Sequence, residues 1–565
     1  MTLEAAKTSG ATSNRFRVVP NGWTILTLLI AGLVTLPVLT VLGFVFVPSP
    51  EVWGHLVETV LSDYVLNTLG LMLGVGTGTL VIGVGSAWLV VMCRFPGKRI
   101  FEWALLLPLA VPTYVIAYAY TDFLQFTGPI QTFLREAFEW GRNDYWFPNI
   151  RSLGGAIAVM SLVLYPYVYL LTRAAFMEQS VCALEVGRSL GRGPWRLFSG
   201  VAVPLARPAI VGGLALALME TLNDFGAVQF FGVDTFTTGI YRTWFGLGEA
   251  AAAAQLAACL LVFVIVLLVL ERWSRRRARF HHTSARYREL PQYQLPRGRA
   301  LLAFAACALP ILVGFVLPAV LLLMMHISEG DPQMGAQMAG YAWNSFKLAS
   351  VTAVVAVSLA VVIGYGVRLQ PGRLTHAAAR IASVGYAIPG SVIAVGILIP
   401  LGWADQRINL FTREHFGFLP GLLLTGTMVA LVYAYVVRFL AVSFNSVEAS
   451  LGKITPNMDA ASRTLGKTAA RTLAVVHLPV MRSSLLAAAI LVFVDVMKEL
   501  PATIILRPFD FDTLAVRAFD LASDERLAQA STSALSIVVV GIIPVILLSI
   551  AMRQSRPGSG AGTGD

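Results

Sequence analysis

Long apolar runs separated by short polar segments form the dominant pattern of this chain. A helix that crosses a bilayer needs about 20 mostly apolar residues. Twelve runs of that kind lie near 23–47, 64–92, 101–121, 153–176, 209–232, 252–271, 300–326, 344–367, 379–402, 418–441, 484–506 and 532–552. The pattern predicts an all-α, polytopic membrane protein with about 12 transmembrane helices.

The spans divide into two halves of six. An Arg-rich segment with two prolines and no apolar periodicity separates the halves, and Asn67-Thr-Leu in the first half matches Asn344-Ser-Phe in the second. Equal numbers of spans predict two parallel six-helix repeats related by an axis along the membrane normal. The predicted parts are an N-terminal tail (1–22), a first half (23–271), a linker (272–299), a second half (300–553) and a C-terminal tail (554–565).

The placement of charge separates a membrane protein from a nucleic-acid-binding one. The chain is 56% hydrophobic and only 13% charged, with a formal net charge of +11, whereas soluble proteins have about 25% charged residues. The basic residues cluster at the ends of apolar runs and do not alternate with aromatic residues. With a cytoplasmic N-terminus, 31 of the 42 Lys and Arg residues lie on the inner side. The positive-inside rule then places both termini and the linker in the cytoplasm.

One of the predicted cytoplasmic loops occurs twice. The first copy reads Glu185-Val-Gly-Arg188-Ser-Leu-Gly191 and continues to Pro204, within 180–208. The second reads Ala460-Ala-Ser-Arg463-Thr-Leu-Gly466 and continues to Pro479, within 455–483. Arginine, leucine, glycine and proline all recur at the same offset of 275 residues (460 − 185). Two matched loops on one membrane protein predict two docking sites for copies of one partner.

Local propensities predict the shape of each loop. A helix runs to Gly191 or Gly466, where the chain reversal requires a residue that tolerates positive φ. A second short helix follows, carrying Trp195 in the first copy, and Pro204 or Pro479 breaks it before the next span. A short helix with an exposed apolar side fits a groove on a partner protein.

Both loops resemble the EAA loop of ABC importer permeases. The first copy keeps the glutamate (Glu185) and the glycine of that motif, whereas the second has Asp459 one residue before the glutamate position. The resemblance implies a type I ABC importer permease with both halves fused, two copies of an ATPase subunit on the loops, and ATP and Mg²⁺ bound in those subunits. Because the copies differ, we expect two unequal ATPase contacts. The residues assigned to docking are Glu185, Arg188, Gly191, Trp195, Pro204, Asp459, Arg463, Gly466 and Pro479.

A pair of acidic residues recurs within an apolar run of each half. Glu220 and Asp224 are four residues apart, and so are Asp495 and Glu499, which predicts one helix face for each pair. Lys498 is a potential partner of either acid in the second half. Ionisable groups at membrane depth face a pathway or one another, so a pathway for a cationic substrate and a structural ion pair both remain open.

The segment from Leu500 to Arg517, with Asp524-Glu525-Arg526 after it, resembles the ferric-iron branch of the fused double permeases. This resemblance implies a permease in a bacterial inner membrane. A periplasmic binding protein would deliver ferric iron, and alternating access would carry it across. Thiamine permeases share the fused layout, so thiamine or another cationic small molecule is the alternative substrate. A secondary transporter is a further alternative, although it needs no matched docking loops.

Two shorter patterns suggest chemistry of other kinds. Arg135-Glu136-Ala-Phe-Glu139 fits an R-E-x-x-E iron signature, and two carboxylates at this spacing can share a hard cation. A solvated helix face, or a surface that meets a substrate-delivery protein, explains Glu136 and Glu139 better. Gly466-Lys467-Thr468 resembles the end of a P-loop, but no strand is predicted before it. With no H-E-x-x-H or G-x-S-x-G arrangement, the sequence predicts a transport subunit without a catalytic site or a cofactor of its own.

Overall fold

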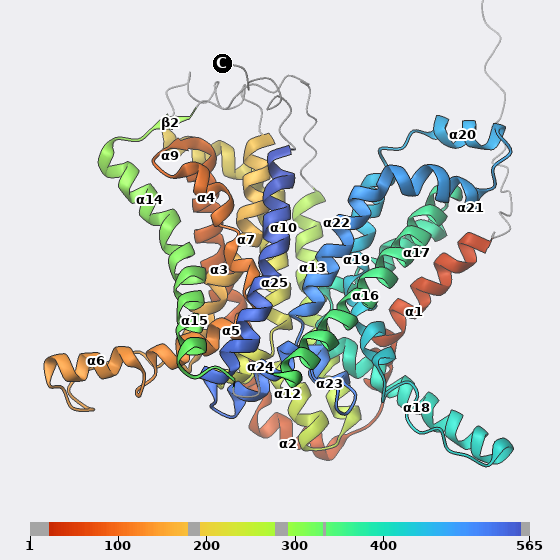
Figure 1. The fold of residues 1–565 in the computed structure, drawn as a ribbon, viewed down its shortest axis with the longest axis horizontal. Helices are drawn as coiled ribbons and strands as arrows, with labels where there is room; N and C mark the ends of the chain where they lie inside the picture. Colours follow the sequence, from red (N-terminus) through yellow and green to blue (C-terminus); the bar gives the residue numbers. More distant parts are fainter. Residues whose placement is uncertain (1–21, 179–192, 277–291, 332–334, 555–565) are drawn as a thin grey trace, which may run out of the picture.

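The computed structural model describes residues 22–178, 193–276, 292–331 and 335–554, and it is helical almost throughout (Figure 1). The elements of the first half are α1 (Gly22–Phe44), α2 (Pro50–Thr59), α3 (Leu61–Met92), α4 (Lys98–Ala104), η1 (Leu107–Ala110), α5 (Thr113–Leu124), α6 (Pro129–Phe138), α7 (Leu153–Glu178), α9 (Pro194–Leu197), η2 (Phe198–Ala202), α10 (Val203–Asn223), α11 (Gly226–Phe230), α12 (Phe236–Tyr241), η3 (Arg242–Gly246) and α13 (Ala250–Arg276). Strand β1 (Cys93–Arg94) pairs in parallel with β2 (Tyr293–Gln294), which lies just before the second half.

The second half repeats this order of elements. It contains α14 (Arg297–Ile311), η4 (Leu312–Val316), α15 (Leu317–Glu329), α16 (Ala336–Leu369), α17 (Arg373–Ala382), η5 (Gly385–Ala387), α18 (Gly390–Phe416), α19 (Met428–Leu451), α20 (Pro456–Thr464), α21 (Ala469–Thr472), η6 (Leu473–His477), α22 (Leu478–Met497), α23 (Pro501–Leu506), α24 (Leu514–Ser523) and α25 (Leu527–Gln554).

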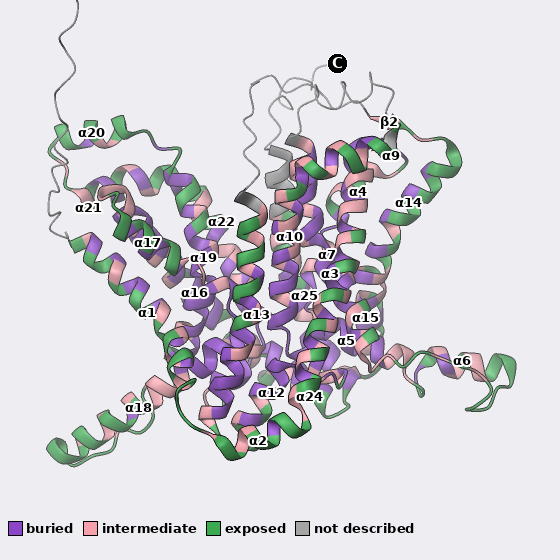
Figure 2. Cartoon of the chain, turned by 180° about the vertical axis from the view of Figure 1, so that it is seen from behind, coloured by how far each residue is buried: buried purple, intermediate pink, exposed green. Residues whose placement is uncertain are grey.

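The number of membrane spans confirms the predicted fold class. Within the described ranges, 11 helices are long and apolar enough to cross a membrane. A bent pair, Lys98–Ala110 with Thr113–Phe138, meets at 89° and brings the number to 12 if it counts as one span. Large apolar side chains remain exposed on the outward faces of these helices, such as Leu33 (57%) and Leu73 (72%). Figure 2 shows the buried residues concentrated where the helices meet.

Several predicted spans were misplaced. Those predicted at 209–232 and 484–506 begin too late, because the spans of the structure are Trp195–Asn223 and Ala469–Met497. Two neighbouring spans of the second half differ as well. The sequence predicted spans at 379–402 and 418–441, whereas α18 begins at Gly390 and the next long helix begins at Met428. The buried residues of α18 lie mainly between Gly390 and Ile397, and its distal part projects sideways from the bundle (Figure 1). The prediction failed because averaged hydropathy does not detect the break at η5 and Pro389, where the proline stands immediately before the new helix.

The first helices of the two halves are exchanged. Helix α1 packs on α16, α17 and α18 of the second half and also on α13 of its own half. Helices α14 and α15 pack against α3, α4 and α5 of the first half, and α15 also packs on α25 of its own half. In Figure 1 the red α1 lies beside the green and teal helices, and the green α14 and α15 lie beside the orange ones. Gly396 permits the close approach of α1, because a Cβ at this position would lie 2.3 Å from the Pro37 carbonyl oxygen. The boundary between halves in the sequence is therefore not the boundary in the packing.

Equivalent residues of the two halves make equivalent contacts. The Asn67 side-chain amide donates to the Asp234 carbonyl at 2.9 Å, and Asn344 donates to the Asp512 carbonyl at 3.1 Å. Thr235 and Thr513, the residues after these carbonyls, stand at the N-termini of α12 and α24. The matched asparagines of the sequence thus connect the second span of each half (α3 or α16) to the segment before its last span.

Candidate functional site

A cavity of about 100 Å³ lies between the two halves, where α10 and α22 end. All five residues predicted to line a pathway line this cavity: Glu220, Asp224, Asp495, Lys498 and Glu499. The other polar or aromatic lining residues include Thr113, Tyr114, Tyr167, Asn223, Tyr386 and Arg438. The tertiary structure therefore brings the two acid pairs of the sequence repeat to a single place.

The acids of each pair do not share a helix face, contrary to the sequence prediction. Helix α10 ends at Asn223, and Asp224 adopts an extended conformation (ψ 134°). Its carboxylate accepts hydrogen bonds from the Ala227 and Val228 amides at 3.0 and 3.1 Å, at the start of α11. The spacing of four residues misled the prediction because the chain leaves the helix inside it.

Glu499 caps the short helix of the second half in the same manner. It lies beyond the end of α22, and its carboxylate accepts hydrogen bonds from the Ala502 and Thr503 amides at 2.9 and 3.1 Å. Pro501 at the first position of α23 suits a helix start, since it has no N–H to satisfy. Carboxylates are favoured at helix N-termini because they accept hydrogen bonds from backbone amides that have no partner within the helix. Asp224 and Glu499 therefore hold the backbone of the cavity wall in both halves.

Arg438 of α19 connects the two halves across the cavity. Its guanidinium lies 3.7 Å from the Glu220 carboxylate and also donates to the Asn223 side-chain oxygen. That oxygen accepts a second hydrogen bond, from the Gly390 amide at 2.7 Å. The Arg438 side chain is only 4% exposed. Four residues from two sequence repeats thus form one buried polar contact.

Sequence reasoning missed Arg438. It lies in the middle of α19, within the span that the sequence predicted near 418–441. The sequence could have identified Arg438, because it is the one basic residue in the apolar run Met428–Leu451 and lies ten residues after the run begins. An ionisable residue at that depth marks a functional or paired position.

Lys498 pairs with Asp495, one of the two acids that the sequence offered as its partner. The Lys498 ammonium lies 3.0 Å from the Asp495 carboxylate, and both side chains keep about a quarter of their surface exposed (27% and 24%). The lining contains four carboxylates and two cations, so its formal charge is 2 − 4 = −2. The cavity is therefore polar and negatively charged.

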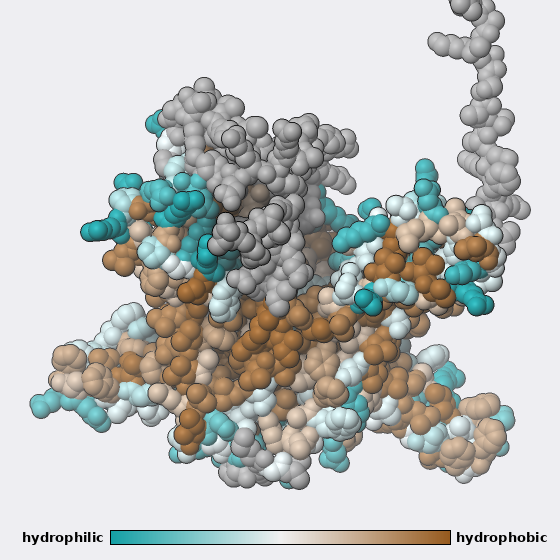
Figure 3. All heavy atoms as spheres, turned by 45° about the horizontal axis from the view of Figure 1, so that its top comes forward, coloured by the Kyte–Doolittle hydropathy of each residue, from teal (hydrophilic) through white to brown (hydrophobic). Residues whose placement is uncertain are grey.

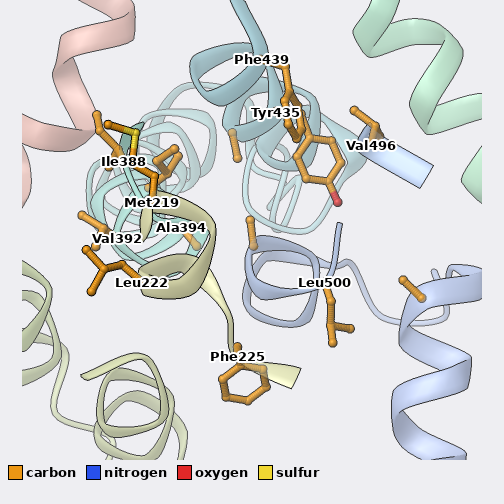
Figure 4. Packing of buried hydrophobic residues seen from close by; sticks show 14 of the residues in the cluster. Met219, Leu222, Phe225, Ile388, Val392, Ala394, Tyr435, Phe439, Val496 and Leu500 are labelled. Atoms are coloured by element: carbon orange, nitrogen blue, oxygen red, sulfur yellow. The ribbon is translucent and has the colours of Figure 1, made fainter. Parts of the chain in front are cut away.

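Apolar side chains surround this polar centre on every contributing helix. Met219 and Leu222 of α10, Val392 of α18, Phe439 of α19 and Val496 of α22 belong to one buried cluster (Figure 4). Charges inside such a low-dielectric frame interact more strongly than in water. The frame also fixes the cavity walls, because side chains in a close-packed cluster have little freedom to move.

The second copy of the repeated loop, residues 455–483, has the predicted helix and turn. Helix α20 ends at Thr464, and Gly466 adopts a positive φ of 71°. The Gly466 amide donates to the Arg463 carbonyl at 2.9 Å, and the Lys467 amide donates to the Ser462 carbonyl at 3.1 Å. These two bonds are the Schellman pattern that ends a helix at a left-handed glycine. The same glycine therefore belongs to a helix end and not to a P-loop after a strand.

Asp459 is held inside the loop by two other elements. Its carboxylate lies 2.7 Å from the Arg368 guanidinium at the end of α16 and 2.8 Å from His477 Nε2 at the end of η6. The His477 side chain is fully buried, and Arg368 also donates to the Leu451 and Ile454 carbonyls, both at 2.8 Å. Arg463 and Leu465, by contrast, are exposed on the outer side of the loop. The loop is thus anchored to two spans through Asp459.

The prolines after the loops do not break the helices, which corrects the prediction. Pro204 and Pro479 lie in the first turns of α10 and α22, and each follows a π-helical turn, η2 or η6. The wider turn accommodates the missing N–H, so each span runs on from the loop helix without a stop (Trp195–Asn223 and Ala469–Met497). Trp195 is 75% exposed at the start of its span. Glu185, Arg188 and Gly191 lie outside the described residues.

Glu136 and Glu139 lie far from the cavity, on the laterally projecting α6 and at its end. Glu136 is exposed on the helix, and Glu139 follows it in a left-handed conformation with φ 53°. Within the described part of the chain, no three His, Cys, Asp or Glu side chains are grouped closely enough to hold a metal ion.

Comparison with known proteins identifies the family. The profile of the family "Binding-protein-dependent transport system inner membrane component" matches residues 79–280. The Fe(3+)-transport system permease protein FbpB 2 of Haemophilus influenzae is 27% identical over 496 residues, which cover 86% of this chain and 90% of the relative. The chain is an ABC importer permease. Its similarity to that relative extends through both halves, in keeping with the length of a fused double permease.

Other relatives of this permease are named for ferric or for sulfate transport. The ferric transport system permease protein FbpB of Actinobacillus pleuropneumoniae is 21% identical over 498 residues, 84% of this chain and 69% of the relative. A probable sulfate transport system permease protein of Chlorokybus atmophyticus is 33% identical over 150 residues, 26% of this chain and 48% of the relative. Permeases of this family are the multi-pass, non-catalytic membrane components of importers. Their partners are an ATPase and a substrate-binding protein.

Proposed function

We propose that this permease imports ferric iron that a periplasmic binding protein delivers. Two relatives that cover more than four fifths of the chain are named for ferric or Fe(3+) transport. The observation that carries the proposal is the charge of the cavity between the halves, where four carboxylates face two cations. Oxygen-rich, negatively charged surfaces suit a hard cation.

The same charge argues against an anionic substrate. The relative named for sulfate transport matches only 26% of the chain. A sulfate ion in this cavity would lie among Glu220, Asp224, Asp495 and Glu499, and like charges at close range repel strongly where water is scarce. Thiamine or another organic cation is the alternative substrate, because the negatively charged cavity would attract any positively charged molecule.

The end of the molecule that carries α9, α20 and α21 is proposed to face the cytoplasm and two ATPase subunits (Figure 1). The excess of Lys and Arg in the predicted inner segments supports this orientation. Exposed Trp195 (75%) and Leu465 (76%) supply apolar contacts, and Arg463 supplies a charged one. Both termini would then be cytoplasmic, and the opposite end would receive the binding protein.

The contacts of Arg438 suggest how access alternates. Arg438 and Gly390 of the second half bind Glu220 and Asn223 of the first. A rigid-body movement of the halves would break these contacts and open the cavity to one side. ATP binding and hydrolysis, with Mg²⁺, would take place in the partner subunits and drive that movement through the docking loops.

Reconstitution tests the proposal directly. The permease would be placed in vesicles with its ATPase, and ATP turnover and uptake would be measured with the binding protein carrying ferric iron, thiamine or sulfate. We expect stimulation and ATP-dependent uptake with ferric iron. Stimulation by thiamine alone would overturn the iron assignment, and uptake without ATP would indicate a secondary transporter.

A further inference from the structure

Two arms project sideways from the bundle, one from each half. The first lateral arm comprises residues 126–148 and includes α6, and the second comprises residues 401–425 and includes the distal part of α18. Figures 1 and 2 show both arms at the end of the molecule opposite α20, pointing in opposite directions. They follow equivalent helices, α5 and the buried part of α18, so they are products of the sequence repeat.

The second lateral arm is an ordered fold and not an extended tail. Asp405, only 1% exposed, accepts hydrogen bonds from the Leu423, Leu424 and Thr425 amides at 3.1, 2.9 and 2.9 Å. Asn409 exchanges two hydrogen bonds with the Gly421 backbone, at 2.9 and 3.0 Å. These bonds fasten the returning chain along the helix.

The first lateral arm is also held by specific contacts. The Arg135 guanidinium lies 4.2 Å from the centre of the Phe126 ring and donates to the Phe126 carbonyl at 2.8 Å. The Tyr145 hydroxyl donates to Gln131 at 2.8 Å, and Trp140 stacks on Tyr145 with ring centres 5.5 Å apart. Both arms therefore present defined surfaces.

Those surfaces are strongly apolar. Helix α6 has apolar residues at 130, 133, 134, 137 and 138, the spacing of one helix face. Large exposed side chains on the two arms are Phe133 (65%), Phe138 (58%), Trp146 (86%), Trp403 (61%), Leu410 (55%), Phe411 (55%), Phe416 (67%), Phe418 (56%), Leu419 (63%) and Leu422 (55%). Exposed apolar patches of this extent indicate a surface that contacts a membrane or another protein.

We propose that the lateral arms lie in the headgroup region of the bilayer and anchor the permease there. Their apolar surfaces continue the lipid-facing surface of the bundle, as Figure 3 shows in brown. Aromatic residues prefer the membrane–water interface, and amphipathic helices lie in its plane. The two arms lie at the same end of the molecule and point in opposite directions. If the axis that relates the two halves is normal to the membrane, both arms lie at the same depth in the bilayer.

The charge of the arms fits a lipid surface rather than a charged protein. The first arm has two Arg and three acidic residues, and the second has two Arg and two acidic residues, so their formal charges are −1 and 0. The Arg407 guanidinium lies 5.0 Å from the centre of the Trp403 ring. A zwitterionic headgroup layer offers both apolar contact and partners for such charges.

Photo-crosslinking of the full complex tests this proposal independently of the substrate. Phe138 and Phe411 would each be replaced by p-benzoylphenylalanine, and Glu136 and Arg413 would serve as matched controls. Each control lies two residues from its partner, about 200° around the helix. Co-purification with the ATPase would establish that each variant folds.

After irradiation in nanodiscs, we expect an intact-mass shift of one phospholipid at Phe138 and Phe411, with a lower yield of lipid adducts at the charged positions Glu136 and Arg413. Adducts with the binding protein at the two aromatic positions would show that the arms form a protein-docking surface, and would overturn the proposal. An absence of lipid adducts at Phe138 and Phe411 would overturn it as well. None of these outcomes depends on whether ferric iron is the substrate.

Discussion

Single carboxylates in this permease have separate structural and electrostatic roles that their spacing in the sequence conceals. Asp224 and Glu499 cap short helices, Asp495 neutralises Lys498, and Asp459 anchors a docking loop. Glu220, by contrast, pairs with Arg438, the arginine that connects the two halves. Substitutions at these positions are therefore expected to differ in what they damage.

Asp459→Asn is expected to destabilise the second docking loop. The neutral amide loses the charge that faces Arg368 and His477, while Arg368 keeps its carbonyl acceptors. The loss should be about 1–3 kcal/mol, the usual range for an impaired buried polar contact. Thermal unfolding of the purified complex in nanodiscs would measure it.

Arg463→Ala, on the exposed side of the same helix, provides the matched control. It should leave stability within about 0.5 kcal/mol of the parent, as surface substitutions do, while it weakens ATPase binding. Equal losses of stability in the two variants would show that Asp459 has no special anchoring role.

The charge of the cavity predicts opposite effects for the two members of its ion pair. Asp495→Asn makes the formal charge of the lining −1, and Lys498→Gln makes it −3. We expect the first variant to lower the initial rate of iron uptake by about tenfold, which corresponds to about 1.4 kcal/mol. The second should keep or raise that rate.

Uptake into vesicles, normalised to the amount of assembled complex, would measure both variants. If both changes lowered uptake equally, the ion pair would be structural and the charge of the cavity would not guide the substrate.

At the scale of helices, the exchange of α1 onto the second half depends on close packing at glycine. Gly396→Ala should lower stability by about 1–3 kcal/mol, the usual cost of overpacking, because the new Cβ would lie 2.3 Å from the Pro37 carbonyl oxygen. Gly402, six residues later in α18, has nothing within 4 Å of an added Cβ. There, Gly402→Ala should be neutral or stabilise the helix by up to about 1 kcal/mol.

Thermal unfolding of the two alanine variants in the same nanodiscs would compare them. An undisturbed Gly396→Ala variant would mean that α1 does not approach α18 as closely as the structure shows.

For the whole molecule, the exchange of first helices predicts that neither half is stable alone. A chain divided between Arg276 and Gln292 should still assemble, because α1 binds the second half while α14 and α15 bind the first. Co-expression of the two fragments with a tag on one should recover both in equal amounts. Each fragment expressed alone should be degraded or aggregate, since its exchanged helix loses the part of its packing surface that the other half supplies. Stable, monodisperse single halves would contradict the exchange.

The sequence by itself determined the features that arise from local chemistry. Apolar run lengths gave the all-α fold and about 12 spans, and the 275-residue repeat gave two equivalent halves. The turn at Gly466 was predictable because few residues other than glycine accept a positive φ. These properties depend on neighbours along the chain, so they can be read without a fold.

Only the tertiary structure decided which distant residues meet. Arg438 reaches Glu220 and Asn223 across 215 or more residues, and Asp459 meets Arg368 and His477 from three separate elements. The helices α10 and α22 end at Asn223 and Met497, so the two acids of each pair do not share a helix face. The second acid of each pair instead caps the next short helix, whose first backbone amides have no partner within that helix. Apolar periodicity specifies that a helix packs, but the partner depends on the shape and polarity of all the others.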